Sequence, residues 1–301
     1  MRDVASLVFR RPRDEDLPRA AAVFGAEEEA LRGRVTMGVD EMRDWWRLFE
    51  LEESWLVEDG EEPVAVGALS ARGGDFNLWV GVHPEYTGRG ISSELISRAE
   101  RSVRGRGGNQ LKAGMLAENE RARLLLEQLG FHEVRRFYRM QIDFDGAPPS
   151  PKPVEGVRIA TFRPEDARSF HSTLNEAFTE DWGFVAMPFD EWKEFRLKAD
   201  DADTSLWFLA WDGAEVAGVI RCDAKKFGGG FVGALGVRKP WRGQGIGTAL
   251  LQHALGEYYC RGMAHVSLGV DAENQSGATR LYERAGMRVV SEDVVFEKAL
   301  T

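Results

Sequence analysis

The sequence contains the same glycine-rich turn twice, and this repeat is the feature that most limits how the chain can fold. The stretch 82–92 (VHPEYTGRGIS) corresponds to 237–247 (VRKPWRGQGIG) at an offset of 155 residues. The offset is still 155 at Asn119 and Asn274, and it becomes 156 at Gly130 and Gly286. Such self-similarity over much of the chain indicates two copies of one structural unit.

The length and composition agree with two globular domains. The chain has 301 residues, of which 43% are hydrophobic and 29% are charged, and domains commonly have about 100–200 residues. Between the copies, residues 146–153 include four prolines, which favour an extended linker. We therefore predict an N-terminal domain over 1–145, a proline-rich linker over 146–154 and a C-terminal domain over 155–301.

The order of predicted elements indicates a mixed α/β fold. In the second copy, patterning and turn residues predict strands at 157–162, 206–211, 216–222, 231–237, 265–270 and 289–296, and helices at 164–178, 187–196, 245–259 and 276–285. Asp212-Gly213 is a hairpin signal, and Asp59-Gly60 is its counterpart in the first copy. We expect two tandem α/β domains, each with a central mixed, mostly antiparallel sheet flanked by helices.

Each glycine turn lies between a predicted strand and a predicted helix. Two glycines let the backbone bend sharply and approach a ligand closely, and the N–H groups of a helix start attract an anion. The turn therefore predicts a pyrophosphate site, although glycine-rich turns also simply connect elements. A P-loop is excluded because no Lys-Ser/Thr pair follows the second glycine, and a Rossmann fingerprint is excluded by the glycine spacing.

A second motif follows about thirty residues after the second glycine turn. Residues 270–287 read VDAENQSGATRLYERAGM. Together with the Arg-Gly-x-Gly turn, this stretch resembles motifs A and B of the GNAT superfamily of acyl-CoA-dependent N-acyltransferases. The resemblance covers nearly the whole chain, and the tandem layout is similar to that of two-domain actinobacterial acetyltransferases.

The resemblance implies acetyl-CoA as the co-substrate and assigns roles to particular residues. Tyr282 would be the general acid that protonates the leaving thiolate. The strand before the second glycine turn, at Leu235-Gly236-Val237, would be splayed from its neighbour, so that its free backbone groups bind the pantetheine amides. The co-substrate-binding residues implied in the second copy are Leu235, Gly236, Val237, Arg242, Gly243, Gln244, Gly245, Ile246, Gly247 and Asn274. In the first copy they are Gly88, Arg89, Gly90, Ser92 and Asn119.

The two copies differ at two positions of these motifs. Thr87 stands where the second copy has Arg242, and Leu126 stands where it has Tyr282. Leucine has no proton to donate. We therefore expect the C-terminal copy to be the catalyst, while the N-terminal copy either binds coenzyme A without turnover or only shapes the substrate cleft.

The sequence constrains the acceptor side of the site less strongly. The strand before the second glycine turn carries no acid, so a water relay or an amine that arrives neutral stands beside four candidate bases, which are Glu180, Asp181, Asp223 and Asp271. Aromatic residues between 178 and 192 predict either a substrate wall or ordinary helix packing. They are Trp182, Phe184, Phe189 and Trp192, with Trp45, Trp46 and Phe49 in the first copy.

The expected function is direct transfer of an acetyl group to a primary amine of a small molecule in a ternary complex, because no Cys or Ser lies in a nucleophile setting. The alternative is a catalytically silent acyl-CoA sensor or scaffold. The net charge of −10 argues against a nucleic-acid partner, and Cys222, Cys260 and the five histidines form no metal-ligand spacing. Without a signal peptide or membrane-spanning run, we expect a cytoplasmic monomer or homodimer with no membrane partner.

Overall fold

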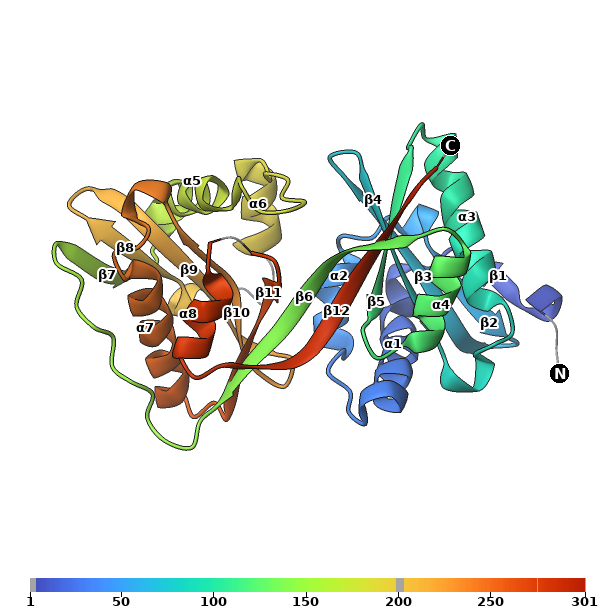
Figure 1. Ribbon diagram of the computed structural model, residues 1–301, viewed down its shortest axis with the longest axis horizontal. Helices are drawn as coiled ribbons and strands as arrows, with labels where there is room; N and C mark the ends of the chain where they lie inside the picture. Colours follow the sequence, from blue (N-terminus) through green and yellow to red (C-terminus); the bar gives the residue numbers. More distant parts are fainter. Residues whose placement is uncertain (1–3, 199–202, 275, 301) are drawn as a thin grey trace. The chain divides into compact units, whose positions relative to one another are not determined.

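The chain forms two compact units (Figure 1). The computed structural model describes residues 4–198, 203–274 and 276–300. Unit 1 consists of Met1–Phe137 with Ser291–Thr301, and unit 2 consists of Tyr138–Val290. Each unit contains one of the two glycine turns.

Unit 1 is built on a sheet with the strand order β1-β2-β3-β4-β5-β12. Neighbouring strands are antiparallel except for the parallel pair β4 and β5. The elements that begin in this unit are β1 (Val8–Arg10), α1 (Leu17–Arg32), α2 (Val39–Trp46), β2 (Trp55–Asp59), β3 (Glu62–Arg72), β4 (Asp75–Val82), α3 (Ile91–Gly105), β5 (Gln110–Leu116), α4 (Glu120–Gln128) and β6 (His132–Asp143).

Unit 2 repeats this plan with the strand order β6-β11-β10-β9-β8-β7. Here the parallel pair is β10 and β11. The elements that begin in this unit are β7 (Val157–Thr161), α5 (Ala167–Phe178), α6 (Phe189–Arg196), β8 (Phe208–Asp212), β9 (Glu215–Lys226), β10 (Gly229–Val237), α7 (Ile246–Cys260), β11 (His265–Asp271), α8 (Ala278–Arg284) and β12 (Arg288–Ala299).

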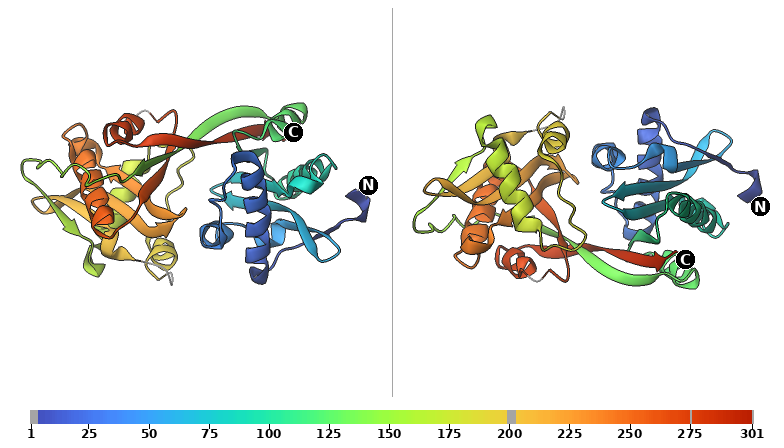
Figure 2. Two further views of the ribbon diagram at one scale, coloured as in Figure 1. Left: turned by 90° about the horizontal axis from the view of Figure 1, so that it is seen from below. Right: turned by 90° about the horizontal axis from the view of Figure 1, so that it is seen from above.

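Helices cover both faces of each sheet. In unit 1, α1 and α2 pack on one face and α3 and α4 on the other. In unit 2, α5 and α6 lie on one face and α7 and α8 on the opposite one (Figure 2). The two covered faces explain why β9 has seven consecutive buried residues, of which only Arg221 is charged, since a strand buried on both sides is mostly apolar instead of alternating.

The units divide the chain at other points than the predicted limits 1–145 and 155–301. β6 and β12 are the final strands of the two copies, and each is a 12-residue strand that continues from one unit into the other. The end of β12, from Asp293 to Ala299, pairs with β5 in unit 1. The periodicity of a strand does not specify which sheet it joins. The prediction therefore placed the final strand in its own copy on the basis of the repeat. Residues 146–154 contain neither helix nor strand.

The elements predicted for the second copy are confirmed, with shifts at their ends. Leu206 lies in a short 3-10 helix, and β8 begins two residues later. The hairpin at Asp212-Gly213 is confirmed by the antiparallel pairing of β8 with β9 and by φ of +57° at Gly213. Gly60, with φ of +68°, has the same role between β2 and β3. None of the described helices is long and apolar enough to cross a membrane.

Candidate functional site

The two central strands of unit 2 separate at one end. β10 pairs with β11 from Gly230 only as far as Val232, which lies opposite Leu268, although β10 continues to Val237. On its other side β10 stays paired with β9 up to its last residue. In the described part of the chain, the edge of residues 233–237 that faces β11 thus has no strand partner. Its N–H and C=O groups, apart from the carbonyl of Val237, which accepts from Arg242, can bind a ligand, as expected for the splayed strand.

The glycine turn that connects β10 to α7 has a conformation that favours glycine. Gly243 has φ of +80° and Gly245 has φ of +88°, both in the left-handed region. Helix α7 begins directly after Gly245, so the N–H groups of its first turn have no acceptor within the helix. A pyrophosphate at this helix start would accept these hydrogen bonds and interact favourably with the helix dipole.

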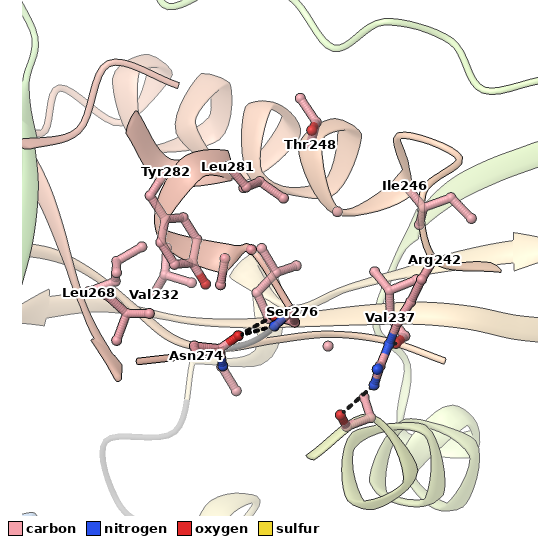
Figure 3. A pocket seen from close by; sticks show the side chains of 18 of the residues that line it. Val232, Val237, Arg242, Ile246, Thr248, Leu268, Asn274, Ser276, Leu281 and Tyr282 are labelled. Carbon is pink, nitrogen blue, oxygen red and sulfur yellow. Dashed lines mark hydrogen bonds between the residues drawn. The ribbon is translucent and has the colours of Figure 1, made fainter. Parts of the chain in front are cut away.

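A cavity of about 550 Å³ extends along the splay and the start of α7 (Figure 3). Tyr282 lines it, together with nine of the predicted co-substrate-binding residues. Those nine are Leu235, Gly236, Val237, Arg242, Gly243, Gly245, Ile246, Gly247 and Asn274. Gln244 is not among the described lining residues, since its amide donates to the carbonyl of Pro240 at 3.2 Å on the exposed side of the turn.

The side chain of Arg242 holds the glycine turn against α5. Its guanidinium donates to the carbonyl of Ala177 at 3.0 Å (Figure 3) and to the carbonyl of Val237 at 3.1 Å. It also forms an ion pair with Glu180 at 2.9 Å. Arg242 is therefore engaged with protein groups and shapes the wall of the cavity, which leaves the N–H groups at the start of α7 as the part of the turn open to an anion.

Tyr282 lies on α8 with its hydroxyl directed into the cavity (Figure 3). The residue is only 7% exposed. Burial raises the pKa of Tyr282, and the negative charge of Asp181 raises it further. The phenol therefore stays protonated at neutral pH, which is the state that a general acid requires.

Asn274 lies in the loop before α8 and lines the cavity without capping the helix. Its Oδ1 accepts a hydrogen bond from the N–H of Ser276 at 2.8 Å. Helix α8 begins only after Gly277, which has φ of +79°. In unit 1, by contrast, Asn119 is the N-cap of α4. The one extra residue of the second copy accounts for this difference.

The four candidate bases lie in different surroundings. Glu180 is exposed and forms ion pairs with two cations of the glycine turn, and Asp223 pairs with Arg221 at 3.0 Å. Among the four, Asp181 alone is a lining residue of the cavity. Burial raises the pKa of Asp181, and the carboxylate of Asp271 adds to the shift. When ionised, Asp181 gives its own part of the cavity wall a negative charge, which favours a cationic group at that place.

Most of the aromatic residues between 178 and 192 pack within the protein. Trp192 is 4% exposed and stacks on Phe170, with ring centroids 6.1 Å apart. Phe189 stacks on Trp192 at 6.0 Å, and Phe184 packs on Phe178 at 6.0 Å. Of these residues Phe178 lines the cavity. Helix packing, the second of the two interpretations, therefore applies to Trp192 and Phe189.

Two arginines of α8 line the cavity although neither was predicted as a site residue. Arg280 and Arg284 belong to the lining, and the first copy has Leu124 and Gln128 at the corresponding positions. Two guanidinium groups in the wall of a cavity are well suited to phosphate groups. The difference in charge between the copies was the sequence signal that would have identified them.

In unit 1 the glycine turn has the same backbone conformation. Gly88 has φ of +78° and Gly90 has φ of +82°, and Ser92 lies in the first turn of α3. Arg89 packs against the turn itself, with its guanidinium 4.2 Å from the centroid of the Tyr86 ring. The helix start predicted for the first copy is therefore present. Its Arg89 lies against the turn, whereas Arg242 of unit 2 reaches from the turn to α5.

The remaining motif positions of unit 1 are used for internal contacts. Leu126, the counterpart of Tyr282, is 4% exposed and packs in the core. The side-chain amide of Asn119 donates to the carboxylate of Glu27 at 3.0 Å. The backbone N–H of Val82, at the end of β4, also donates to this carboxylate. Burial nevertheless raises the pKa of Glu27 to about 7.

The raised pKa of Glu27 predicts that the free energy of unfolding depends on pH. Its carboxyl keeps its proton up to about pH 7 in the folded chain but loses it near pH 4.5 in the unfolded chain. Because the folded state binds more protons in this interval, the free energy of unfolding should fall by up to about 3 kcal/mol as the pH rises through it. Urea denaturation of the wild type and Glu27→Gln at several pH values tests this. The variant should gain stability relative to the wild type with rising pH, and a constant difference would contradict the assignment.

A family comparison supports the interpretation of both motifs. The model of the acetyltransferase (GNAT) family matches the chain twice, over residues 21–131 and 167–287. The first match contains the glycine turn of unit 1, and the second contains the glycine turn and Tyr282 of unit 2. The two matches together cover more than half of the chain.

Individual relatives are similar over most of their length. The mycothiol acetyltransferase of Catenulispora acidiphila is 29% identical over 223 residues, which are 72% of this chain and 70% of the relative. That of Mycolicibacterium vanbaalenii is 31% identical over 226 residues, 71% and 72% of the two chains.

Solved structures show the same fold. A GCN5-related N-acetyltransferase from Sphaerobacter thermophilus aligns with a TM-score of 0.84 and 31% identity, covering 98% of this chain and 96% of that one. A tandem GNAT protein from the clavulanic acid biosynthesis pathway has a TM-score of 0.72 and 19% identity, covering 98% and 99% of the two chains. The second likeness concerns the fold alone.

Proposed function

The chain belongs to the acetyltransferase (GNAT) family, and we propose that its unit 2 transfers the acetyl group of acetyl-CoA to a primary amine of a small molecule. The observation that carries this proposal is the composition of the cavity. It brings together the free edge of residues 233–237, the start of α7 and the buried hydroxyl of Tyr282. These are a site for amide groups, a site for a pyrophosphate and a proton donor.

In the proposed reaction the pyrophosphate lies at the start of α7 and the pantetheine arm follows the free edge of β10. The neutral amine attacks the carbonyl carbon of the thioester, so that a C–N bond forms as the C–S bond breaks. Tyr282 donates its proton to the leaving thiolate. The proton released by the amine passes to solvent, from which Tyr282 recovers its own.

A bulge in β10 supports the placement of the thioester. The pairing of β10 with β9 shifts register between Val232 and Ala234, at the point where the pairing with β11 ends. A bulge redirects the backbone groups next to it. We place the thioester carbonyl here, because an N–H group directed into the cavity stabilises the negative oxygen that forms during the attack.

The acceptor class follows from the cavity wall and from the relatives. Asp181 and its acidic neighbours favour a cationic molecule, as an amine is at neutral pH. The relatives described above are named mycothiol acetyltransferases. A mycothiol-related amine is therefore the first acceptor to test, followed by polyamines and amine-containing antibiotics.

Turnover with acetyl-CoA and this panel of amines tests the proposal. We expect equimolar release of free thiol and N-acetylated amine. Gly88→Asp should retain this activity, because it alters only the glycine turn of unit 1. A side chain at position 88 meets no atom within 4 Å, although the φ of +78° strains a residue other than glycine, so thermal unfolding verifies the fold of the variant. Loss of turnover in a folded Gly88→Asp variant would place the active site in unit 1, and binding of acetyl-CoA without turnover on any amine would favour a sensor.

A further inference from the structure

Unit 1 has the same splay as unit 2, but the separation begins later. β4 pairs with β5 as far as Trp79 with Gly114, and β4 then continues to Val82. Its register with β3 is continuous from Val82 to Asp75, without the bulge of β10. By the repeat offset, the last pair of unit 1 corresponds to Ala234 and Gly269, which are not paired in unit 2. The gap between the strands is therefore shorter in unit 1.

The indole of Trp79 lies over the backbone of β5 beside this gap. A Cβ atom on Gly114 would be 2.3 Å from the ring, so only glycine permits this contact. Trp45 of α2 packs on Trp79, with ring centroids 5.0 Å apart. The ring thus contacts both a helix and the strand β5 at the place that corresponds to the proposed thioester site.

The same place is open in unit 2. Ala234 replaces the tryptophan, and both Ala234 and Gly269 line the cavity. A Cβ atom on Gly269 would meet nothing within 4 Å. Both units have a glycine on the second strand, so the tryptophan of the first strand makes the difference between a filled and an open gap.

A carboxylate occupies the other end of the splay in unit 1. Glu27 accepts hydrogen bonds from the N–H of Val82 and from Asn119. The backbone group of Val82 corresponds to that of Val237, which in unit 2 belongs to the free edge. Glu27 follows Phe24 by three residues, as Asp181 follows Phe178, and both phenylalanine rings pack on the corresponding glycines of the two sheets.

The shorter acid of unit 2 does not make these contacts. In the part of the chain that the structure describes, the carboxylate of Asp181 has no hydrogen-bond partner. Asp181 has one methylene group fewer than Glu27, and it follows the end of α5, whereas Glu27 lies within α1. At the end of β10 the carbonyl of Val237 accepts from Arg242, but its N–H is not bound by Asp181, whereas the N–H of Val82 at the end of β4 is bound by Glu27.

From these differences we infer that Trp79 and Glu27 fill the acyl-pantetheine path of unit 1, so that the chain binds one acetyl-CoA, in unit 2. Trp79 occupies the place of the thioester. Glu27 accepts the hydrogen bond that the N–H of Val82 would otherwise donate to the carbonyl of a pantetheine amide. The inference rests on the proposed co-substrate site of unit 2. It assigns to unit 1 a closed cleft behind an intact glycine turn.

Calorimetric titration of the full chain with acetyl-CoA tests this inference. We expect one equivalent to bind to the wild type and two to Trp79→Ala/Glu27→Ala, in which the path of unit 1 is opened. Trp45→Phe is the matched control, because it alters the neighbouring indole but leaves Trp79 in place, and it should still bind one equivalent. Far-ultraviolet circular dichroism and thermal unfolding of each variant verify its fold.

The outcomes separate this inference from the function proposed for unit 2. Two equivalents bound to the wild type would overturn the closed cleft and leave the function of unit 2 intact. No binding at all would overturn the proposed function. One equivalent in a folded Trp79→Ala/Glu27→Ala variant would show that these side chains are not what closes unit 1. The number of acetyl-CoA molecules that the wild type binds tests the closed cleft by itself, so this test does not depend on the folding of the double variant.

Discussion

Replacing Tyr282 by phenylalanine is expected to lower the rate of acetyl transfer by about 10²–10⁴-fold while leaving the affinity for acetyl-CoA unchanged. The phenyl ring keeps the volume of a residue that is 7% exposed, so the walls of the cavity are preserved. Only the hydroxyl directed into the cavity is lost, and with it the proton for the leaving thiolate. The raised pKa of Tyr282 makes it a donor at neutral pH, and the neighbouring Leu281 cannot replace it.

Single-turnover measurement of thiol release, with calorimetry for binding, tests this expectation. Tyr259→Phe is the matched control, because Tyr259 is 39% exposed on α7 and does not line the cavity. Its rate should equal that of the wild type. If Tyr282→Phe retained the wild-type rate, Tyr282 would be a packing residue and another group or solvent would protonate the thiolate.

Replacing Ala234 by tryptophan is expected to weaken acetyl-CoA binding by at least about 100-fold, equivalent to about 2.7 kcal/mol. The substitution gives unit 2 the residue that unit 1 has at Trp79. The opposing Gly269 leaves the space empty, as Gly114 does beneath the indole of unit 1. The new ring should therefore fit between the strands and occupy the proposed thioester site without disrupting the sheet.

Calorimetry and thermal unfolding distinguish blocked binding from lost folding. Val289→Trp is the control for added bulk, because Val289 is 41% exposed and lies outside the cavity. Ala234→Trp should unfold at a temperature close to that of the wild type but bind no acetyl-CoA in the concentration range of the wild type. Retained binding in a folded Ala234→Trp variant would contradict the placement of the arm between β10 and β11.

The sequence motifs located most of the cavity because their conformations are local. The left-handed conformation of Gly243 and Gly245 and the start of α7 depend on a few consecutive residues. The prediction for Arg242 was incomplete, because its contacts with Ala177 and Glu180 join segments that are distant in the sequence. No local pattern indicates that an arginine beside an anion-binding turn is engaged by the protein.

The predicted domain limits differ from the limits of the two compact units, for a related reason. The repeat correctly showed two units, but the final strand of the second copy pairs with β5 of unit 1. Strand propensity depends on neighbouring residues, whereas the choice of a partner strand depends on the packing of the whole sheet. Because β6 and β12 are equivalent strands with similar patterns, the sequence does not indicate whether such a strand pairs within its own copy or with the sheet of the other copy.

By itself the sequence determined that the chain contains two related α/β units, that each has a helix start suited to an anion, and that only the second has a tyrosine at the position for which we propose a general acid. These properties follow from glycine conformation, hydrophobic periodicity and residue identity at fixed spacing. The tertiary structure decided which cleft is open. Trp79 and Glu27 are unremarkable in the sequence, and they fill unit 1 only because folding brings Gly114, Val82 and Asn119 beside them.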